Sequence, residues 1–148
     1  GKRKIAKKAA SLIKTGDTLF LDASTTVFFL AKEIKNMEGI TVITNSLRII
    51  NELSHNDGIS IYCTGGFLVG TNNSFTGNTQ VSFIEKNFFV DKCFISCSGV
   101  SPEGGMLESR DDEAAVKRAM CKNSKNVVLL CDKIAYYCSD RRGGYNDN

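Results

Sequence analysis

The stretch that most constrains the fold of this chain is residues 16–35, where a short apolar run ends at polar residues and an amphipathic pattern follows. Thr18–Leu21 predicts a buried strand, and Val27–Lys35 predicts a helix. Between them lie a carboxylate and three hydroxyl residues, Asp22, Ser24, Thr25 and Thr26. A strand, a tight polar loop and a helix N-terminus are typical of open α/β sheets, in which ligands collect at this junction.

The hydroxyl residues of this loop allow two interpretations. Ser and Thr are preferred N-cap residues, because their oxygen accepts a hydrogen bond from a free backbone N–H of the first helical turn. The same free N–H groups, at the positive end of the helix dipole, also suit a phosphate group. The loop by itself therefore predicts either a helix cap or an anion site.

The composition is that of one globular domain. The chain has 148 residues, of which 42% are hydrophobic and 24% charged, enough for a substantial core. No apolar run is long enough for a membrane helix, and no signal peptide is evident, so we expect a cytoplasmic protein. The cysteines form no Cys-x-x-Cys pair and the chain has one histidine, His55. We therefore expect free thiols, no metal site and no cofactor.

The net charge of +3 conceals an uneven distribution. Residues 1–14 carry six basic side chains and no acid, so the remaining residues, with 13 basic and 16 acidic side chains, have a net charge of −3. Direct binding to duplex DNA needs a basic surface, which this body lacks by count. Because apolar residues recur in 3–14 at helical spacing, we expect an amphipathic helix with a solvated lysine face.

The rest of the chain alternates strand-like and helix-like segments. Strands are expected at 18–21, 40–44, 59–64, 90–98 and 127–131, with a hairpin at 67–69 and 74–76. Helices are expected at 3–14, 27–35, 47–53, 77–88 and from 111 to about 123. A glycine-rich loop is expected at 100–109, and residues 136–148 are expected to be a disordered tail. Because the strands are short apolar runs separated by helices, we expect residues 1–135 to form one α/β domain, a largely parallel sheet with helices on both faces.

Polar residues follow several of the expected strands. They are Asp22 to Thr26, Asn45-Ser46, Ser98-Gly99 and Asp132. The carboxyl ends of parallel strands meet at one edge of the sheet, so these clusters are expected to converge. The pair Gly65-Gly66 also follows a strand, and it suits a close backbone approach to a ligand and a plain turn equally well.

These residues together resemble the C-terminal sensor domain of DeoR-family bacterial transcriptional regulators. The similarity runs from about Ile5 to Asp132 and rests on a series of motifs in the same order. They are residues 16–26, Thr44-Asn45-Ser46-Leu47, Gly65-Gly66, Phe94 to Val100, Glu113 to Met120, and Leu130-Cys131-Asp132.

The resemblance implies a fold similar to ribose-5-phosphate isomerase and a pocket for a phosphorylated sugar. In the family, the loop that matches Asp22, Ser24, Thr25 and Thr26 lies at the effector pocket. Other matching positions surround the same cleft: Asn45, Gly65, Gly66, Ser98, Gly99, Glu113, Lys117, Asp132 and Lys133. The resemblance also implies a homo-oligomer and a winged helix-turn-helix domain ahead of the sensor. DNA is then contacted only through that domain, which this chain lacks.

The chain departs from the family pattern at two positions. Val69 stands near the place where an arginine usually follows the Gly-Gly motif, and Ala135 stands where the last motif usually has a lysine. Two alternatives to the sensor therefore stay open. One is an aldose–ketose phosphate isomerase with Glu113 as general base, assisted by Asp22 or Asp132. The other is an oligomerisation module whose pocket is vestigial.

Overall fold

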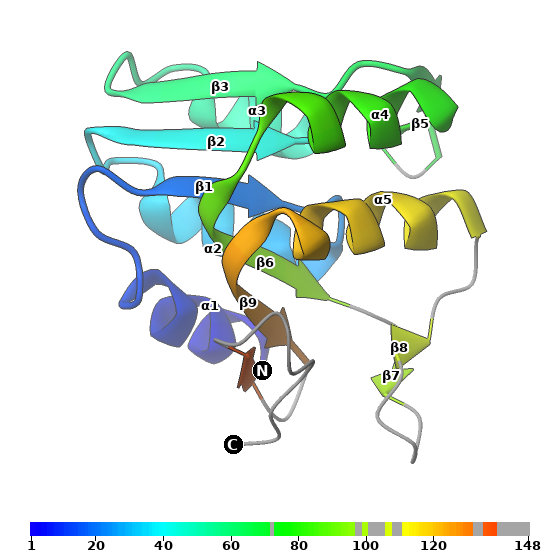
Figure 1. The fold of residues 1–148 in the computed structure, drawn as a ribbon. Helices are drawn as coiled ribbons and strands as arrows, with labels where there is room; N and C mark the ends of the chain where they lie inside the picture. Colours follow the sequence, from blue (N-terminus) through cyan, green and yellow to red (C-terminus); the bar gives the residue numbers. More distant parts are fainter. Residues whose placement is uncertain (72, 97–98, 101–105, 108–110, 132–134, 139–148) are drawn as a thin grey trace.

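The computed structural model describes residues 1–71, 73–96, 99–100, 106–107, 111–131 and 135–138. In this part of the chain, a six-stranded sheet lies between two groups of helices (Figure 1). The strands of this sheet are β1 (Thr18–Leu21), β2 (Ile40–Thr44), β3 (Ile59–Cys63), β6 (Val90–Ser96), β9 (Ser124–Leu130) and β10 (Ala135–Cys138). Two small hairpins pair β4 (Phe67–Val69) with β5 (Ser74–Thr76) and β7 (Gly99–Val100) with β8 (Met106–Leu107). The helices are α1 (Lys2–Ala10), α2 (Thr25–Ile34), α3 (Leu47–Leu53), α4 (Asn78–Asn87) and α5 (Asp111–Lys122).

The order of the strands across the sheet is β10-β9-β6-β1-β2-β3. From β3 to β9 every neighbouring pair is parallel, and β10 runs antiparallel to β9. The chain moves outward from β1 through β2 to β3 and then returns to the other side of β1 with β6. The largely parallel α/β sheet predicted from the sequence is therefore confirmed. In such sheets the reversal of strand order, here between β1 and β6, opens a crevice beyond the strand carboxyl ends.

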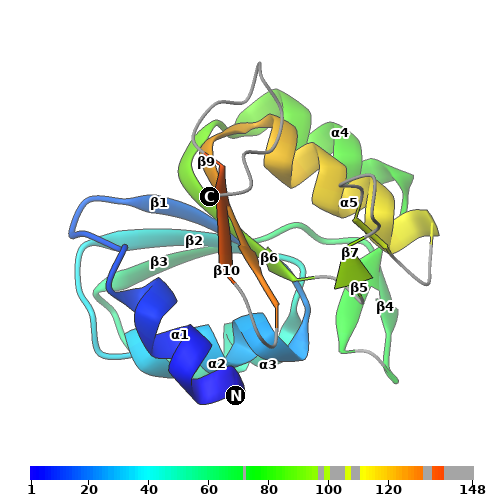
Figure 2. The same ribbon diagram turned by 90° about the horizontal axis from the view of Figure 1, so that it is seen from below.

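Helices cover the sheet on both faces (Figure 2). The helices α1, α2 and α3 lie on one face, and α4 and α5 lie on the other. Strand β1 shows why the sequence needs both layers, because successive side chains of a strand point to opposite faces. Leu19 and Leu21 belong to the core under α1–α3, whereas Phe20 belongs to the core under α4 and α5. None of the three is exposed, as expected for a strand that is covered on both sides.

Helix α1 ends earlier than the sequence predicted. Its amphipathic character is confirmed, because Ala6 and Ala9 are buried and the lysine side chains lie at the surface. The helix stops at Ala10 rather than residue 14, and the Ser11 hydroxyl bonds to the Lys8 carbonyl instead. Ile13 nevertheless packs into the core, so the apolar pattern extends beyond the helix.

Two predictions near the C-terminus were wrong in part. Residues 136–138 are not tail, because they belong to β10, an edge strand that pairs with β9. The expected loop at 100–109 includes strand residues, since Met106–Leu107 pairs with Gly99–Val100. Both elements pair with the strand that precedes them in the chain, but strands of two residues in β7 and β8 and of four in β10 carry too little hydrophobic periodicity to be recognised from the sequence. Residues 139–148 lie outside the described part of the chain.

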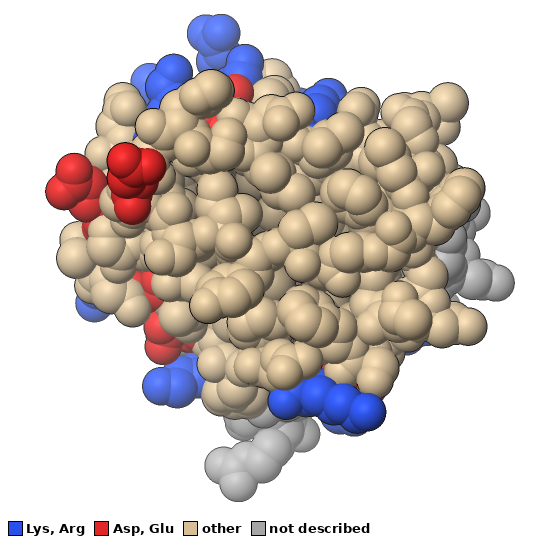
Figure 3. Space-filling view, turned by 90° about the horizontal axis from the view of Figure 1, so that it is seen from above, with Lys and Arg blue, Asp and Glu red and all other residues tan. Residues whose placement is uncertain are grey.

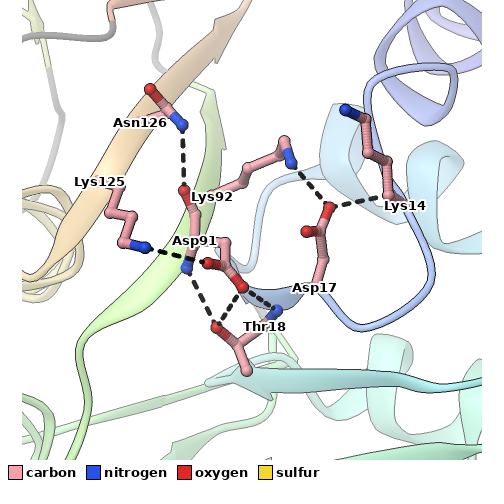
Figure 4. A network of polar contacts seen from close by, with 7 residues as sticks. All are labelled: Lys14, Asp17, Thr18, Asp91, Lys92, Lys125 and Asn126. Atoms are coloured by element: carbon pink, nitrogen blue, oxygen red, sulfur yellow. Dashed lines mark hydrogen bonds and ion pairs between the residues drawn. The ribbon is translucent and has the colours of Figure 1, made fainter.

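A network of polar contacts ties together the amino ends of β1, β6 and β9 (Figure 4). The Asp91 carboxylate accepts hydrogen bonds from the Thr18 backbone N–H at 2.8 Å and from its hydroxyl at 3.0 Å. Lys125 lies 3.8 Å from the same carboxylate, and the Lys92 ammonium donates to Asp17 at 2.7 Å. The bonds from Thr18, and then the nearby lysines, hold the pKa of Asp91 below its ordinary value, although burial opposes this shift.

The first prediction concerns Asp91. Asp91→Ala should lower the free energy of unfolding by about 1 kcal/mol at pH 7, because the Thr18 donors lose their acceptor. The folded pKa lies below the ordinary value of 3.8. The stability from this carboxylate is therefore fully present above pH 3.8 and is lost as the pH falls through the folded pKa. Urea unfolding from pH 3 to pH 7 measures this contribution. The difference in free energy of unfolding between the native chain and Asp91→Ala should be constant above pH 5 and become smaller in acid.

A suitable control is Asp57→Ala, since Asp57 is exposed in the turn before β3 and makes no hydrogen bond or ion pair with described residues. The free energy of unfolding of Asp57→Ala should differ from that of the native chain by almost nothing at every pH. If the difference for Asp91→Ala is equally small, or becomes larger in acid, the network contributes no charge-dependent stability.

Candidate functional site

Asp22 lies at the carboxyl end of β1 and joins it to β6. Its side chain is almost completely buried, with 1% exposed. One carboxylate oxygen accepts the backbone N–H of Ser96 at 2.8 Å, and the other accepts both the backbone N–H and the hydroxyl of Ser24, at 2.9 and 2.6 Å. Both oxygens of Asp22 are therefore used within the protein. This carboxylate positions the loop rather than presenting itself to a ligand.

Lys117 brings a positive charge from α5 to the same point. Its ammonium lies 3.3 Å from Asp22 and also donates to the backbone carbonyl of Ser96. The lysine is 8% exposed, so this is a buried ion pair at the reversal of strand order between β1 and β6. Buried charges persist when they are paired and hydrogen-bonded, as both are here.

At the N-terminus of α2, the structure shows which of the two interpretations of the hydroxyl loop, helix cap or anion site, applies to Ser24. Its hydroxyl oxygen accepts the Val27 N–H at 3.2 Å and donates to Asp22, so Ser24 is the N-cap. Thr25 is exposed and Thr26 is buried. Their backbone N–H groups are the first two of the helix and have no partner among the described residues. Ser24 therefore caps the helix, and the backbone N–H groups of Thr25 and Thr26 remain as two unpaired donors at its N-terminus.

Asn45, at the carboxyl end of β2, docks the β4–β5 hairpin. Its backbone carbonyl accepts the Phe75 N–H at 2.9 Å, and its side-chain amide approaches the Phe75 carbonyl at 3.4 Å. The Asn45 side-chain oxygen is buried and has no partner among the described residues. The next residue, Ser46, caps α3 through the Ile49 N–H. Asn45 thus combines a structural contact with a buried acceptor that has no partner among the described residues.

The pair Gly65-Gly66 forms a turn that packs closely on the same hairpin. Both glycines have positive φ, 70° and 112°. A Cβ on Gly66 would lie 2.6 Å from the Thr76 carbonyl oxygen, so a side chain there would require backbone movement. Both special properties of glycine are therefore used inside the protein.

Gln80 is a site residue that the sequence did not indicate. It lies in the first turn of α4 and is completely buried. Its side-chain nitrogen lies 2.8 Å from the Thr64 hydroxyl and 2.6 Å from the carbonyls of both Gly65 and Phe75. It therefore fastens the end of β3 to the hairpin. Only a pattern of buried polar contacts reveals this role, because a glutamine in a helix is ordinarily a surface residue.

The remaining predicted residues are placed in part. Glu113 lies four residues before Lys117, so the two share one face of α5. Gly99 begins β7, directly beyond the end of β6. Ser98, Asp132 and Lys133 lie outside the described residues. The structure thus brings Asp22, Ser24 and Lys117 into contact, while Asn45, Gly65 and Gly66 gather around the hairpin beside the neighbouring strands.

A separate hollow of about 340 Å³ lies on the outer surface of α2 and α3. It is lined by Phe28, Arg48, Asn51, Glu52 and His55. The Arg48 guanidinium lies 5.3 Å from the centre of the Phe28 ring, which stabilises the cation on the aromatic face. His55 therefore belongs to this surface and not to the predicted cleft. Among the described residues, no group of His, Cys, Asp and Glu side chains could hold a metal ion.

Cys63 and Cys93 are free thiols, as predicted for them. Burial, and then the neighbouring Cys121, raises the pKa of the Cys93 thiol, so it remains protonated and behaves as a small apolar side chain. None of the helices in the described part of the chain has the length and apolar character that a membrane crossing requires.

Comparison with known families gives a match to the DeoR C terminal sensor domain over residues 1–136. This chain belongs to the DeoR family. Curated relatives of this DeoR sensor domain include the HTH-type transcriptional regulator GolR of Listeria innocua, 41% identical, and the HTH-type transcriptional repressor GlcR of Bacillus subtilis, 42% identical. Each alignment covers 88% of this chain and 51% or 50% of the relative. The chain therefore spans about half the length of the curated relatives it matches.

Solved structures place the DeoR sensor domain among ribose-5-phosphate isomerase-like folds. The isomerase of Methanocaldococcus jannaschii matches with a TM-score of 0.62 over 87% of this chain and 50% of the isomerase, at 16% identity. An isomerase in complex with phospho-erythronic acid matches with the same TM-score over 89% of this chain and 51% of that chain, at 14% identity. At such low identity the likeness establishes the fold alone, and it confirms the fold predicted from the sequence.

The second prediction separates capping from the neighbouring hydroxyl. Ser24→Ala should lower the free energy of unfolding by about 1–2 kcal/mol, because it removes both the helix cap and a bond to Asp22. The matched control is Thr25→Ala, whose exposed side chain should change stability by less than about 0.5 kcal/mol. Urea denaturation followed by circular dichroism measures both. Equal losses in the two variants would contradict the capping role of Ser24.

The third prediction concerns the buried ion pair. Lys117→Met should lower the free energy of unfolding by about 3–5 kcal/mol, because it leaves the Asp22 carboxylate buried without its cation. Lys122→Met is the matched control on the same helix, since Lys122 is 71% exposed and lies 3.8 Å from Glu85. That exposed pair should contribute less than about 1 kcal/mol. A loss for Lys117→Met no larger than for Lys122→Met in chemical denaturation would show that the pair does not hold the loop.

Proposed function

We propose that this chain is an effector-binding sensor that controls DNA binding by a helix-turn-helix domain carried on the same polypeptide. The curated relatives are named as HTH-type regulators and repressors, and this chain matches about half of each. The mildly acidic body offers no basic surface by count, which supports DNA contact through another domain. A cytoplasmic location and a homo-oligomeric state are part of this proposal.

The observation that carries the effector site is the arrangement at the carboxyl ends of β1 and β6. Two backbone N–H groups, of Thr25 and Thr26, are open at the N-terminus of α2, and the helix dipole gives this point positive potential. Asp22 would repel an anion, but Lys117 lies 3.3 Å from it and balances its charge. The loop therefore offers donors without a net negative charge, which suits a phosphate group.

A phosphorylated sugar or polyol is the ligand class that these features favour. One relative, 33% identical, is named the glycerol-3-phosphate regulon repressor of Escherichia coli, and one structural neighbour holds phospho-erythronic acid. In this chain, Asn45 lies at the adjacent strand end with a buried side-chain oxygen that has no partner among the described residues, so a small movement of this side chain would let it accept a hydrogen bond from a sugar hydroxyl. Phosphate would bind at α2 and the hydroxylated carbon chain would extend toward β2.

We expect the sensor to bind its ligand without converting it. The relatives are named as transcriptional regulators, and the likeness to isomerases is one of fold. Lys117 and both oxygens of Asp22 are occupied by contacts within the protein, so neither is poised for proton transfer. Binding would instead shift a conformational equilibrium by favouring one state over the other.

The fourth prediction tests the site by thermal unfolding against sugar phosphates, the matching free sugars and inorganic phosphate. A sugar phosphate that binds should add about 2.7 kcal/mol at 100 times its dissociation constant, well beyond free sugar or phosphate. Thr25→Pro should abolish this shift, because it removes one of the two open N–H groups. Proline is favoured at the first helical position, and Ser24 already has the extended conformation that proline requires before it.

Thr25→Ala is the matched control, since it keeps the backbone N–H and should keep most of the shift. Absence of a shift with every phosphorylated ligand would contradict the sensor and favour a vestigial pocket. A shift that survives Thr25→Pro would place the ligand elsewhere. Turnover of ribose 5-phosphate that Glu113→Gln abolishes would support the isomerase alternative instead.

A further inference from the structure

Residues 58–84 contain no Lys, Arg, Asp, Glu or His, although 24% of the chain is charged. This segment forms β3, the β4–β5 hairpin and most of α4. An uncharged segment is unremarkable when it is buried. Here, however, it contributes a large part of the surface, because only a minority of its side chains are buried.

The uncharged segment gathers on one side of the molecule. Strand β3 is the uppermost strand of Figure 1, with α4 and β5 beside it, and Figure 3 looks down on this side. A broad region there lacks charged side chains, and lysine, arginine and acidic residues lie around its margin (Figure 3). Large apolar side chains are exposed in the segment: Tyr62 by 50%, Phe67 by 74% and Leu68 by 42%. Depletion of charge with exposed aromatic residues is the composition of a protein interface, and we call this region the neutral face.

Strand β3 adds an open backbone edge to the neutral face. It is the last strand of the sheet and pairs only with β2. The Thr64 N–H donates to Thr44 and the Gly58 carbonyl accepts from Gly39, so residues 58, 60, 62 and 64 direct their backbone groups toward β2. Because this direction alternates along a strand, Ile61 and Cys63 direct their N–H and C=O groups away from the sheet.

This edge has none of the usual features that prevent strand pairing. Natural edge strands are commonly protected by lysine, proline or a bulge. The sequence of β3, Ile59-Ser60-Ile61-Tyr62-Cys63, has no charge and no proline, and its register with β2 runs without interruption. The edge is therefore ready to receive another strand.

We infer that the neutral face is the dimer interface of this sensor, formed by antiparallel pairing of β3 with β3 of a second copy. The inference gives a surface to the homo-oligomer of the proposed function and rests on that part of it, but not on the effector. Antiparallel pairing of identical strands about a twofold axis is self-complementary. With the axis at Ile61, the outward-facing groups of Ile61 and Cys63 meet outward-facing groups of the partner strand.

The character of the face favours a second copy over other occupants. Without charges it has no means of attracting nucleic acid or a charged partner, whereas two neutral faces meet without repulsion. A domain attached ahead of Gly1 would join the molecule near α1 and β9, at the opposite edge of the sheet from β3 (Figure 1). The aromatic rings add apolar area to the contact, because Tyr62 packs on Phe88 with ring centres 5.3 Å apart and its other side remains exposed.

The fifth prediction tests this interface by sedimentation equilibrium of the 148-residue chain. The native chain should be a dimer, and Cys63→Pro should raise the dimer dissociation constant at least tenfold. Proline removes an N–H that faces away from β2, which an edge strand tolerates within its own sheet. Cys63→Ala keeps that N–H and should associate like the native chain.

A second pair of variants tests the side chains of the face. Phe67→Lys should weaken the dimer at least tenfold, because it replaces a large exposed ring of the neutral face with a charge that would lose its water in the contact. Leu12→Lys, at an exposed apolar residue outside the neutral face, should leave association unchanged. Hydrogen exchange gives a measurement that needs no variant: the amides of Ile61 and Cys63 should exchange more slowly at concentrations above the dissociation constant than below it.

A monomeric native chain at every accessible concentration would overturn the inference. So would a folded Cys63→Pro variant that associates as tightly as Cys63→Ala, or a dimer in which the amides of β3 gain no protection. If Cys63→Pro fails to fold, Phe67→Lys and hydrogen exchange decide. The effector shift is measured separately on the same variants, so failure of the dimer leaves the proposed ligand site standing, and loss of the ligand leaves the dimer standing.

Discussion

The contacts made by the Asp22 carboxylate are the interactions on which the rest of this domain depends. The carboxylate joins the carboxyl ends of β1 and β6 through the Ser96 N–H, holds the loop before α2 through Ser24, and pairs with Lys117 of α5. Four elements from three separate parts of the sequence therefore meet at one buried side chain. Because a buried carboxylate without these partners would be very costly, the elements can be arranged in few other ways.

This arrangement explains how a helix N-terminus becomes available for binding. Ser24 caps α2 and Asp22 fixes the cap, so the first turn needs no further partner and its remaining N–H groups face outward from a rigid base. At the ends of the neighbouring strands, polar side chains make contacts within the protein instead of leaving donors unpaired. Gln80 and Asn45 use their side-chain nitrogens to fasten the β4–β5 hairpin beside the strand ends. In the candidate site, the N-terminus of α2 thus offers unpaired backbone donors, whereas the residues around the β4–β5 hairpin are packed against one another.

The two surfaces of functional interest lie apart because the order of the strands separates them. The strand reversal places β1 and β6 in the middle of the sheet, where their carboxyl ends lie between helices on both faces. It also leaves β3 at an edge, where its backbone and the uncharged segment that follows it reach the surface. The proposed ligand site at the centre and the proposed interface at the edge are therefore joined by β1, β2 and β3, which are hydrogen-bonded in series.

The sequence by itself determined the α/β class, the positions of most strands and helices, and the residue types at the strand ends, because periodicity and capping are local properties. It did not determine that Gln80 fastens the end of β3 to the hairpin or that Lys117 neutralises Asp22. These contacts join groups that are far apart in the chain: Gln80 lies 16 positions after Thr64, and Lys117 lies 95 positions after Asp22 and meets it only once the sheet has formed. Only the tertiary structure decides such contacts, since they depend on which strands become neighbours.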